Sequence, residues 1–416
     1  MTNSKILLII GFVWPEPNSS AAGSRMLQLI EAFIGFGYHI TFASACAKTD
    51  KAFDLKNIGV NTASIQLNNS SFDDFITDLN PHVVLFDRFM IEEQFGWLVA
   101  QHCPDAVRIL DTEDLHFLRK GRQMALNAGK PFNDYYLYND FTKREIASIY
   151  RCDLSLIISK EEMCILEGEF KIDSDLLLYI PFMLEAVDEE ASEALPKFKE
   201  RTHFITIGNF LHEPNYDAVQ YLKETIWPLI RKQLSEVNLH IYGAYATQKV
   251  LQLHNVNEGF LIKGFAENVE DVMQNARVCL APLRFGAGLK GKLIDAMQNG
   301  TACVMTSIAA EGMFNISETH DYVADDPQAF ADMAVKLYQN EAEWEFYSKY
   351  GFNIINERFK KSDFQKILIL KVEAITNQLQ KHRHQNFIGQ LLQHHTLQST
   401  KYMSKWIEAK NRQNPS

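Results

Sequence analysis

The stretch from residue 281 to residue 313 limits what this chain can fold into more than any other. An apolar run at 278–281, typical of a buried strand, leads into three glycines: Gly286, Gly288 and Gly291. An apolar stripe at helical spacing comes next, formed by Leu289, Leu293, Ile294 and Met297. Gly300 is expected to end that helix, and residues 302–306 form a second apolar run. The expected order is therefore strand, glycine loop, helix, strand.

A glycine loop that opens a helix is suited to bind an anion, because backbone N–H groups can approach it and the helix N-terminus is partly positive. Lys290 and Lys292 lie beside Gly288 and in the first turn, where positive charge opposes the helix dipole. A multiply charged anionic ligand that faces the two lysines would offset this unfavourable interaction with the helix dipole. Asp295 shares a helix face with Lys292 and could accept hydrogen bonds from ribose hydroxyls. The alternative is two solvated surface lysines, with Lys292 paired to Asp295.

The segment resembles the donor-binding motif of family 4 retaining glycosyltransferases, which have the two-lobed GT-B fold. The similar subset of that family reads A-P-L-R-x-G-A-G-x-K-G-K-(x)2-E-A-M, and the likeness here covers about thirty residues. Asp295 stands at the second of two family glutamates eight positions apart, the one that holds the ribose. Ala287 stands at the first and has no carboxylate, which puts the usual contacts to the donor sugar in question.

The resemblance implies a retaining glycosyltransferase, similar to hexosyltransferases, that moves a sugar from a nucleotide-diphosphate sugar such as a UDP- or GDP-sugar. The acceptor would be a glycan, a lipid-linked sugar or another molecule, and no cofactor or bound metal is implied. The implied fold is α/β, with two Rossmann-like doubly wound halves that face each other across a cleft and helices at the C-terminus. Polysaccharide biosynthesis is the expected setting.

The same resemblance suggests domain limits. Residues 1–190 would form the acceptor-side half and residues 200–358 the donor-binding half. A helix at 359–380 would cross back to the first half, leaving a basic tail at 381–416 with six Lys or Arg and one Glu. A basic amphipathic tail can lie on an anionic membrane surface, and the alternative is a packing or oligomer helix.

In the first half, the loop after the expected strand at 5–12 carries small residues at 21–24. Gly23 among them would let a ligand approach the N-terminus of the next helix. Arg25 could reach an anion there or lie on the surface as an ordinary helical arginine. In the resembled family this loop lies near the donor phosphates.

The expected strand at 107–110 ends in the sequence Asp-Thr-Glu-Asp-Leu-His, residues 111–116. Open α/β sheets place ligands at the carboxyl ends of their strands, so Glu113, Asp114 and His116 cluster at a plausible cleft position. A histidine beside carboxylates can carry a proton near neutral pH. We therefore predict His116 and Asp114 as catalytic residues. Alternatively, Asp114 caps the next helix and His116 only packs.

In the second half, the strand at 204–207 leads into a turn where many family members carry an arginine soon after the glycine. None occurs between residues 208 and 215, so phosphate neutralisation would fall on Lys290, Lys292 and Arg284. Asn209 is a candidate polar contact in that turn. Glu311 follows the strand at 302–306 and could contact donor hydroxyls, or it could be a simple turn residue.

The composition narrows the class of protein. The net charge of −11 argues against non-specific nucleic-acid binding. Six cysteines without a C-x-x-C pair signal neither a zinc ribbon nor a redox motif, which suits a reducing cytosol. No run reaches the ~18 apolar residues of a membrane span. A cytoplasmic protein is expected, with peripheral contact at the inner face of the membrane through the tail as an open alternative and the oligomeric state undecided.

Two other functions fit parts of the sequence. Gly286, Gly288 and Gly291 also match G-x-G-x-x-G, with Glu311 twenty residues later, as in NAD-type oxidoreductases. That fingerprint belongs in the first βαβ unit of a sheet, whereas these glycines lie deep in the chain. A non-catalytic relative that binds a nucleotide is the other candidate, because Ala287 removes a motif carboxylate.

Overall fold

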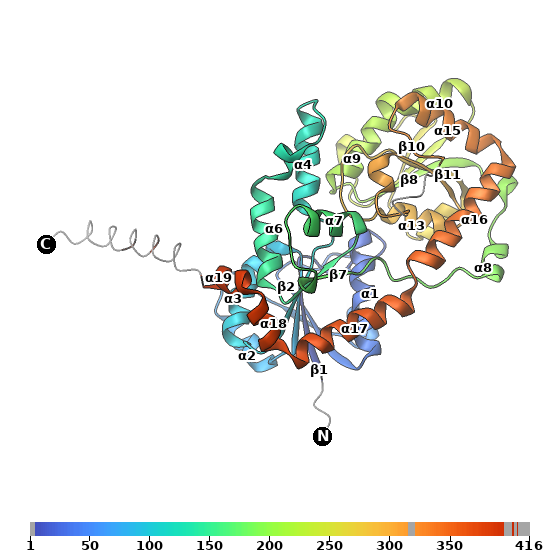
Figure 1. Cartoon of the computed structure of the whole chain (residues 1–416). Coiled ribbons are helices and arrows are strands. Elements are labelled where there is room, and N and C mark those ends of the chain that lie inside the picture. The colour runs from blue at the N-terminus through green and yellow to red at the C-terminus, as the bar shows by residue number, and fades with distance from the viewer. Residues whose placement is uncertain (1–4, 315–320, 395–401, 403–405, 407–416) are drawn as a thin grey trace.

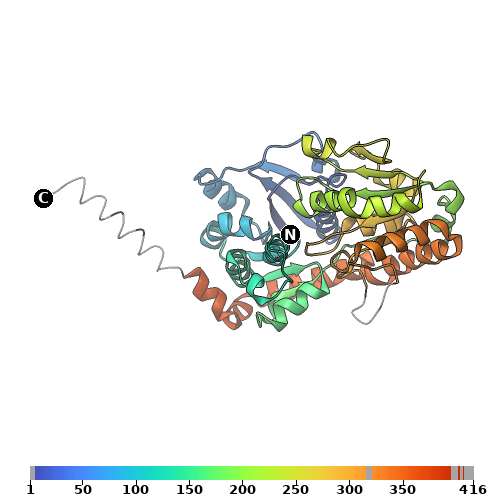
Figure 2. The same ribbon diagram turned by 90° about the horizontal axis from the view of Figure 1, so that it is seen from above.

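Two lobes, each built around its own parallel sheet, make up the computed structural model (Figure 1). It describes residues 5–314, 321–394, 402 and 406. The first lobe runs from blue to green in Figure 1, and the second from light green to orange. Seen from above in Figure 2, the two lobes lie side by side, and the C-terminal helices extend from the second lobe to the first.

The N-terminal lobe contains a seven-stranded sheet of order β3-β2-β1-β4-β5-β6-β7, in which every strand pair is parallel. Its strands are β1 (Lys5–Gly11), β2 (Tyr38–Ser44), β3 (Asn61–Ser64), β4 (Val83–Asp87), β5 (Val107–Asp111), β6 (Leu154–Ile157) and β7 (Leu177–Tyr179). The strand order reverses at β1, between β2 and β4. Such a reversal opens a crevice at the carboxyl ends of the strands.

The C-terminal lobe has a five-stranded parallel sheet of order β10-β9-β8-β11-β12. Its strands are β8 (His203–Ile207), β9 (Leu239–Tyr242), β10 (Phe260–Gly264), β11 (Ala276–Ala281) and β12 (Ala302–Met305). Here the order reverses at β8, beside β11. The predicted arrangement of two doubly wound α/β halves is confirmed.

Helices cover both sheets. In the N-terminal lobe they are α1 (Ala21–Gly35), α2 (Ser71–Leu79), α3 (Phe89–His102), α4 (His116–Asn127), α5 (Asp134–Leu137), α6 (Asp140–Arg151) and α7 (Lys160–Gly168). After α8 (Glu189–Ala194), the C-terminal lobe has α9 (Glu213–Tyr221), α10 (Trp227–Gln233), α11 (Gln248–Leu251), α12 (Val269–Asn275), α13 (Gly291–Gln298), α14 (Ser307–Ala310), α15 (Pro327–Gln339) and α16 (Glu341–Arg358). A π-helical turn, Leu222–Ile226, joins α9 to α10, and short 3₁₀ turns lie at 55–58, 174–176 and 198–200.

The chain returns to the N-terminal lobe through α17 (Lys361–Asn377), α18 (Leu379–Gln385) and α19 (Phe387–Gln393). Leu368 and Val372 of α17 are buried in the same hydrophobic cluster as β1 and α1. The two segments that cross between the lobes are themselves paired. The Leu184 N–H donates to the Phe359 carbonyl at 2.7 Å, and the Lys361 N–H donates to the Leu184 carbonyl at 2.9 Å.

Candidate active site between the lobes

The glycine loop of the C-terminal lobe is seated against the strand ends of the N-terminal lobe. Gly288 has φ +64°, a conformation that side-chain-bearing residues rarely adopt, and a Cβ added there would lie 2.9 Å from the Cβ of Asp114. Its N–H donates a hydrogen bond to Oε1 of Glu162 on α7, at 2.9 Å. Ala287 is buried in a hydrophobic cluster of the N-terminal lobe. Only a loop without side-chain bulk at residue 288 fits this contact.

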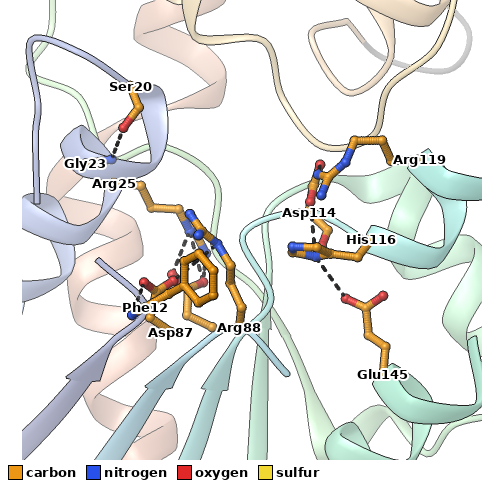
Figure 3. Close-up of polar contacts among 11 residues, drawn as sticks. Phe12, Ser20, Gly23, Arg25, Asp87, Arg88, Asp114, His116, Arg119 and Glu145 are labelled. Carbon is orange, nitrogen blue, oxygen red and sulfur yellow. Dashed lines mark hydrogen bonds and ion pairs between the residues drawn. The ribbon is translucent and has the colours of Figure 1, made fainter. Parts of the chain in front are cut away.

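Two helix N-termini meet at this place. A Cβ built on Gly291, the first residue of α13, would lie 2.6 Å from the Cβ of Ala21, the first residue of α1. Gly23 lies in the first turn of α1, where a Cβ would fall 2.5 Å from the backbone of Glu16. The Gly23 N–H donates to the hydroxyl of Ser20, the N-cap (Figure 3). Because both helix ends are partly positive, the junction favours an anion.

The two motif lysines are buried, so the interpretation of them as solvated surface residues is wrong. Lys290 and Lys292 are only 7% and 8% exposed. The Lys290 ammonium donates to the carbonyls of Ala287 and Gly288, at 3.0 and 2.6 Å, and Lys292 donates to Oδ1 of Asn215 at 3.0 Å. Desolvation lowers the pKa of both lysines, that of Lys292 to about 8. Asp295 loses solvation too, and this effect, with Glu270, raises its pKa to about 7.

His116 and Asp114 lie together at the carboxyl end of β5. His116 is the first residue of α4, and its Nδ1 is 3.0 Å from the carbonyl of Asp114 and 3.5 Å from Oε1 of Glu145 (Figure 3). The Asp114 carboxylate forms an ion pair with Arg119. Burial opposes ionisation of Asp114, but Arg119 and His116 together hold its pKa below the usual value. The carboxylate therefore stays charged at neutral pH, beside the imidazole of His116.

Arg25 requires a correction, because the structure gives it a role inside the N-terminal lobe. Its side chain is fully buried and forms a two-pronged ion pair with Asp111, with Nε–Oδ1 and Nη2–Oδ1 distances of 3.0 and 2.9 Å. Nη1 donates to the carbonyl of Ile180 at 2.6 Å. A guanidinium with no exposed surface offers no donor to a phosphate. Arg25 instead ties α1 to β5 and to the chain that leaves β7.

Arg284 and Asn209 do not join the lysines. Arg284 pairs with Asp217 of α9, with an Nε–Oδ2 distance of 2.9 Å, and its guanidinium lies over the ring of Tyr221. Asn209 turns back on its own loop, where Oδ1 accepts the Leu211 N–H at 2.9 Å. The Arg284 guanidinium and the Asn209 side-chain oxygen therefore have their partners within the C-terminal lobe.

Glu311 faces the opposite lobe. Its carboxylate forms a two-pronged ion pair with Arg122 of α4, with both N–O distances at 2.7 Å. Arg122 also donates to the carbonyl of Gly286 at 2.8 Å, so one arginine of the N-terminal lobe holds both the glycine loop and Glu311. In this structure the carboxylate of Glu311 is used to join the lobes.

Sequence reasoning missed Arg119, Arg122 and Glu162 altogether. Glu162 is 1% exposed, and its Oε1 accepts the N–H groups of Leu115 and Gly288, which come from different lobes. Burial, reinforced by the charge of Asp114, raises the pKa of Glu162 to about 8. These three residues lie on helices at ordinary polar positions, and no sequence spacing connects them to the glycine motif.

His212 comes from the loop before α9, within electrostatic range of Arg119 and Asp114. Desolvation, followed by the charge of Arg119, lowers the pKa of His212 to about 3, although the residue keeps solvent-accessible surface. The imidazole is therefore neutral at physiological pH. Among the described residues, no three His, Cys, Asp or Glu side chains are grouped as a metal-binding cluster. None of the helices that the structure describes has both the length and the apolar character needed to cross a bilayer.

The fold and the position of the site define a class of protein, the two-lobed GT-B fold. Residues 201–340 match the family model of glycosyl transferases group 1. A protein of Klebsiella pneumoniae described as an uncharacterized 44.6 kDa protein in the cps region is 23% identical over 237 residues. That match covers 54% of this chain and 58% of the relative's length, so the chain spans little more than half of it.

Solved structures share the fold at low sequence identity. The structure of TarM superposes on this chain with a TM-score of 0.69 at 10% sequence identity, and the match covers 89% of this chain and 99% of that chain. A mutant of TarM from S. aureus has also been solved. The pneumococcal O-GlcNAc transferase GtfA, solved with UDP and GlcNAc, gives 0.66 at 13% identity, over 90% and 99%. HepE of Anabaena, solved with UDP and glucose, gives 0.63 at 11% identity, over 89% and 100%.

Proposed function

We propose that this protein is a glycosyltransferase that takes a sugar from a nucleotide-diphosphate sugar. The observation that carries the proposal is the junction of the α1 and α13 N-termini across the lobes, with Lys290 and Lys292 beside it. The match of residues 201–340 to glycosyl transferases group 1 supports a donor site at that position. The UDP present in the solved GtfA and HepE structures supports a nucleotide-sugar donor.

The positive charges at the junction determine where the donor would bind. The diphosphate would lie at the two helix N-termini, where it would draw Lys290 and Lys292 away from their present partners and favour their protonated forms. As the sugar leaves, the diphosphate gains negative charge, and fixed cations and N–H groups stabilise that charge more than they stabilise the ground state. Asp295 would accept hydrogen bonds from the ribose, and His116 with Asp114 would face the transferred sugar. Retention of configuration is part of the proposal and rests on the resemblance of the motif.

The proposed domain division follows the same lines. Residues 1–190 would bind the acceptor and residues 200–358 the donor, with a helix at 359–380 that crosses back to the first lobe and a basic tail at 381–416. In this division Glu311 and Arg122 face each other from opposite domains. Glu311 could then serve the donor hydroxyls only after it releases Arg122.

The position of the glycines in the fold weighs against the oxidoreductase alternative. Gly286, Gly288 and Gly291 lie between β11 and α13, whereas a dinucleotide fingerprint occupies the turn after the first strand of its sheet. The first strand of this lobe is β8, and the turn after it holds Asn209 and His212. A non-catalytic nucleotide-binding relative is therefore the alternative to be tested against turnover.

The test is thermal unfolding of the purified chain with UDP, GDP or NADH, compared between the wild type and Lys290→Ala. A ligand at a hundred times its Kd adds about 2.7 kcal/mol of stability, so binding gives a clear rise in the melting temperature. We expect one nucleoside diphosphate to raise it in the wild type, and Lys290→Ala to lose most of the rise. Stabilisation by NADH alone would favour an oxidoreductase. Nucleotide binding without sugar transfer would favour the non-catalytic relative.

A further inference from the structure

Two residues at the ends of neighbouring strands have strained backbones. Arg88 follows β4 with φ +74°, and Glu113 follows β5 with φ +63°. Neither is a glycine, and such conformations persist where the surroundings hold them in place. A hydrogen bond restrains the backbone of Arg88, because its N–H donates to the carbonyl of Asp111 at 2.8 Å. The strain fixes both residues at the carboxyl edge of the sheet, where ligands bind in open α/β folds.

The side chains of both residues keep hydrogen-bonding groups free within the part of the chain that the structure describes. The Arg88 side chain is 17% exposed, and its Nε is 3.6 Å from Oδ1 of Asp87, beyond hydrogen-bond distance. Throughout the part of the chain that the structure describes, its guanidinium makes no hydrogen bond, and the Glu113 carboxylate makes neither a hydrogen bond nor an ion pair. By contrast, Asp87 accepts the Phe12 N–H at 2.9 Å, and Asp111 is fully paired with Arg25.

An exposed aromatic ring lies against the guanidinium. Phe12 is 38% exposed, and the Arg88 guanidinium lies 5.0 Å from the centre of its ring (Figure 3). Phe12 follows β1 and Arg88 follows β4, so the pair stands at the point where the strand order reverses. An aromatic face beside hydrogen-bonding groups is the combination that binds a pyranose, whose C–H face packs on the ring while its hydroxyls reach the polar groups.

This group of residues adjoins the site already described. The carbonyl of Glu113 lies 3.5 Å from the position that a Cβ on Gly288 would occupy. Phe89, the residue after Arg88, packs edge-to-face against His116 with ring centres 5.5 Å apart. A sugar held at Phe12 would therefore be next to the glycine loop and on the N-terminal side of it.

We propose that Phe12, Arg88 and Glu113 form a subsite for a neutral pyranose of the acceptor. The sugar ring would pack on Phe12, one hydroxyl would accept from Arg88 and another would donate to Glu113. A neutral sugar is favoured because the two cations here, Arg25 and Arg88, are already matched by Asp111 and Asp87. No surplus positive charge is available for a uronate or a sugar phosphate. The proposal rests on the proposed sugar transfer and adds the chemistry of its acceptor.

The test measures sugar binding without any donor. Saturation-transfer NMR on the full chain, with a panel of neutral methyl pyranosides, gives a Kd for each sugar. We expect Glu113→Ala, Arg88→Lys and Phe12→Leu each to weaken binding of the best neutral sugar about tenfold or more, because a hydrogen bond or an aromatic contact is lost. Glu167→Gln, which neutralises an exposed carboxylate on α7, should leave binding unchanged.

Nucleotide-induced stabilisation of the same variants separates this proposal from the proposed function. If UDP or GDP stabilises all variants equally while the sugar affinity falls only in the three subsite variants, the subsite stands. Unchanged sugar affinity in those variants, or tighter binding of methyl glucuronide than of any neutral sugar, would overturn it and leave the donor site untouched. Failure of every nucleotide to bind would instead refute the donor site, whatever the sugars do.

Discussion

Burial sets the charge of single residues at the glycine motif. Lys292 and Asp295 lie one turn apart in α13, and desolvation moves the pKa of Lys292 to about 8 and that of Asp295 to about 7. Both groups therefore change charge close to neutral pH. Such shifts are common where groups are held ready for a ligand at some cost to stability.

Asp295→Asn should stabilise the free protein and weaken nucleotide binding. The pKa of Asp295 rises from 3.8 in the unfolded chain to about 7 in the folded protein, so its ionisation costs stability as the pH rises through that window. Replacement by Asn removes a cost of about 1–3 kcal/mol above pH 7, below the ceiling that ~1.4 kcal/mol per pKa unit would set. Urea unfolding at pH 5 and pH 8 measures it, and the gain should be larger at pH 8. An equal gain at both pH values would refute the assignment.

Arg25→Met should destabilise the fold without removing the donor site. The substitution leaves Asp111 buried without its partner, and loss of one member of a buried ion pair costs about 3–5 kcal/mol. Urea unfolding measures the loss. Arg284→Met is the matched control, because it breaks a two-pronged pair with Asp217 near the surface, where such a pair contributes about 0–1 kcal/mol. Equal losses in the two variants would contradict the buried role of Arg25.

At the scale of elements, the glycine loop and α7 form the contact that closes the lobes. Glu162 of α7 accepts one N–H from its own lobe and one from Gly288. Burial in this contact, reinforced by the charge of Asp114, raises the pKa of the Glu162 carboxyl from 4.5 to about 8. We therefore expect a state in which the lobes separate and expose Glu162 to lose this proton, so the closed state should lose stability relative to such an open state as the pH rises toward 8.

Glu162→Gln should make closure independent of pH in this range. The amide oxygen can still accept both N–H groups, and the group no longer titrates. Small-angle scattering of the free protein at pH 6 and pH 8.5 reports the radius of gyration, which should increase with pH in the wild type and stay constant in the variant. The exposed carboxylate variant Glu167→Gln should behave as the wild type does. A matching increase in Glu162→Gln would show that another group, such as Lys290, controls closure.

At the scale of the whole molecule, the C-terminal helices combine a fixed face and an exposed apolar face. Arg383 of α18 forms ion pairs with Asp153 at 2.8 Å and donates to the carbonyl of Ala106, which fastens the segment to the N-terminal lobe. Ile388 and Leu391 of α19 are more than half exposed. Residues 395–401, 403–405 and 407–416 of the predicted tail lie outside the described residues. We propose that the exposed face contacts an anionic membrane surface.

Vesicle binding tests that proposal. The full chain should cosediment with vesicles that contain anionic lipid, and added salt should weaken the binding because the tail 381–416 carries six Lys or Arg against one Glu. Replacing Ile388 and Leu391 by Ser should reduce the bound fraction severalfold. Leu251→Ser, which removes an exposed apolar side chain from the C-terminal lobe, is the control. Equal binding by all variants would leave α19 as a packing or oligomer helix.

The local pattern of apolar residues predicted most of the fold, because the strands of a buried parallel sheet are nearly continuous apolar runs in the sequence. Strands such as β1, β4 and β11 could be located from that signal alone. The edge strand β3 (Asn61–Ser64) was missed, since it reads Asn-Thr-Ala-Ser and is stabilised only by pairing with β2. The π-helical turn Leu222–Ile226 between α9 and α10 likewise has no local sequence signal.

The chain's own sequence determined the two α/β halves and the glycine loop at the start of α13, because apolar period and glycine placement are local properties. Which charged residues meet at that loop was decided by the tertiary structure. Arg25 pairs with Asp111, which lies 86 residues away in the sequence. Gly288 donates to Glu162, which lies 126 residues away. Burial then fixes whether each group is charged, since desolvation depends on everything packed around it. A sequence lists the candidates for a site, and only folding across the two lobes selects among them.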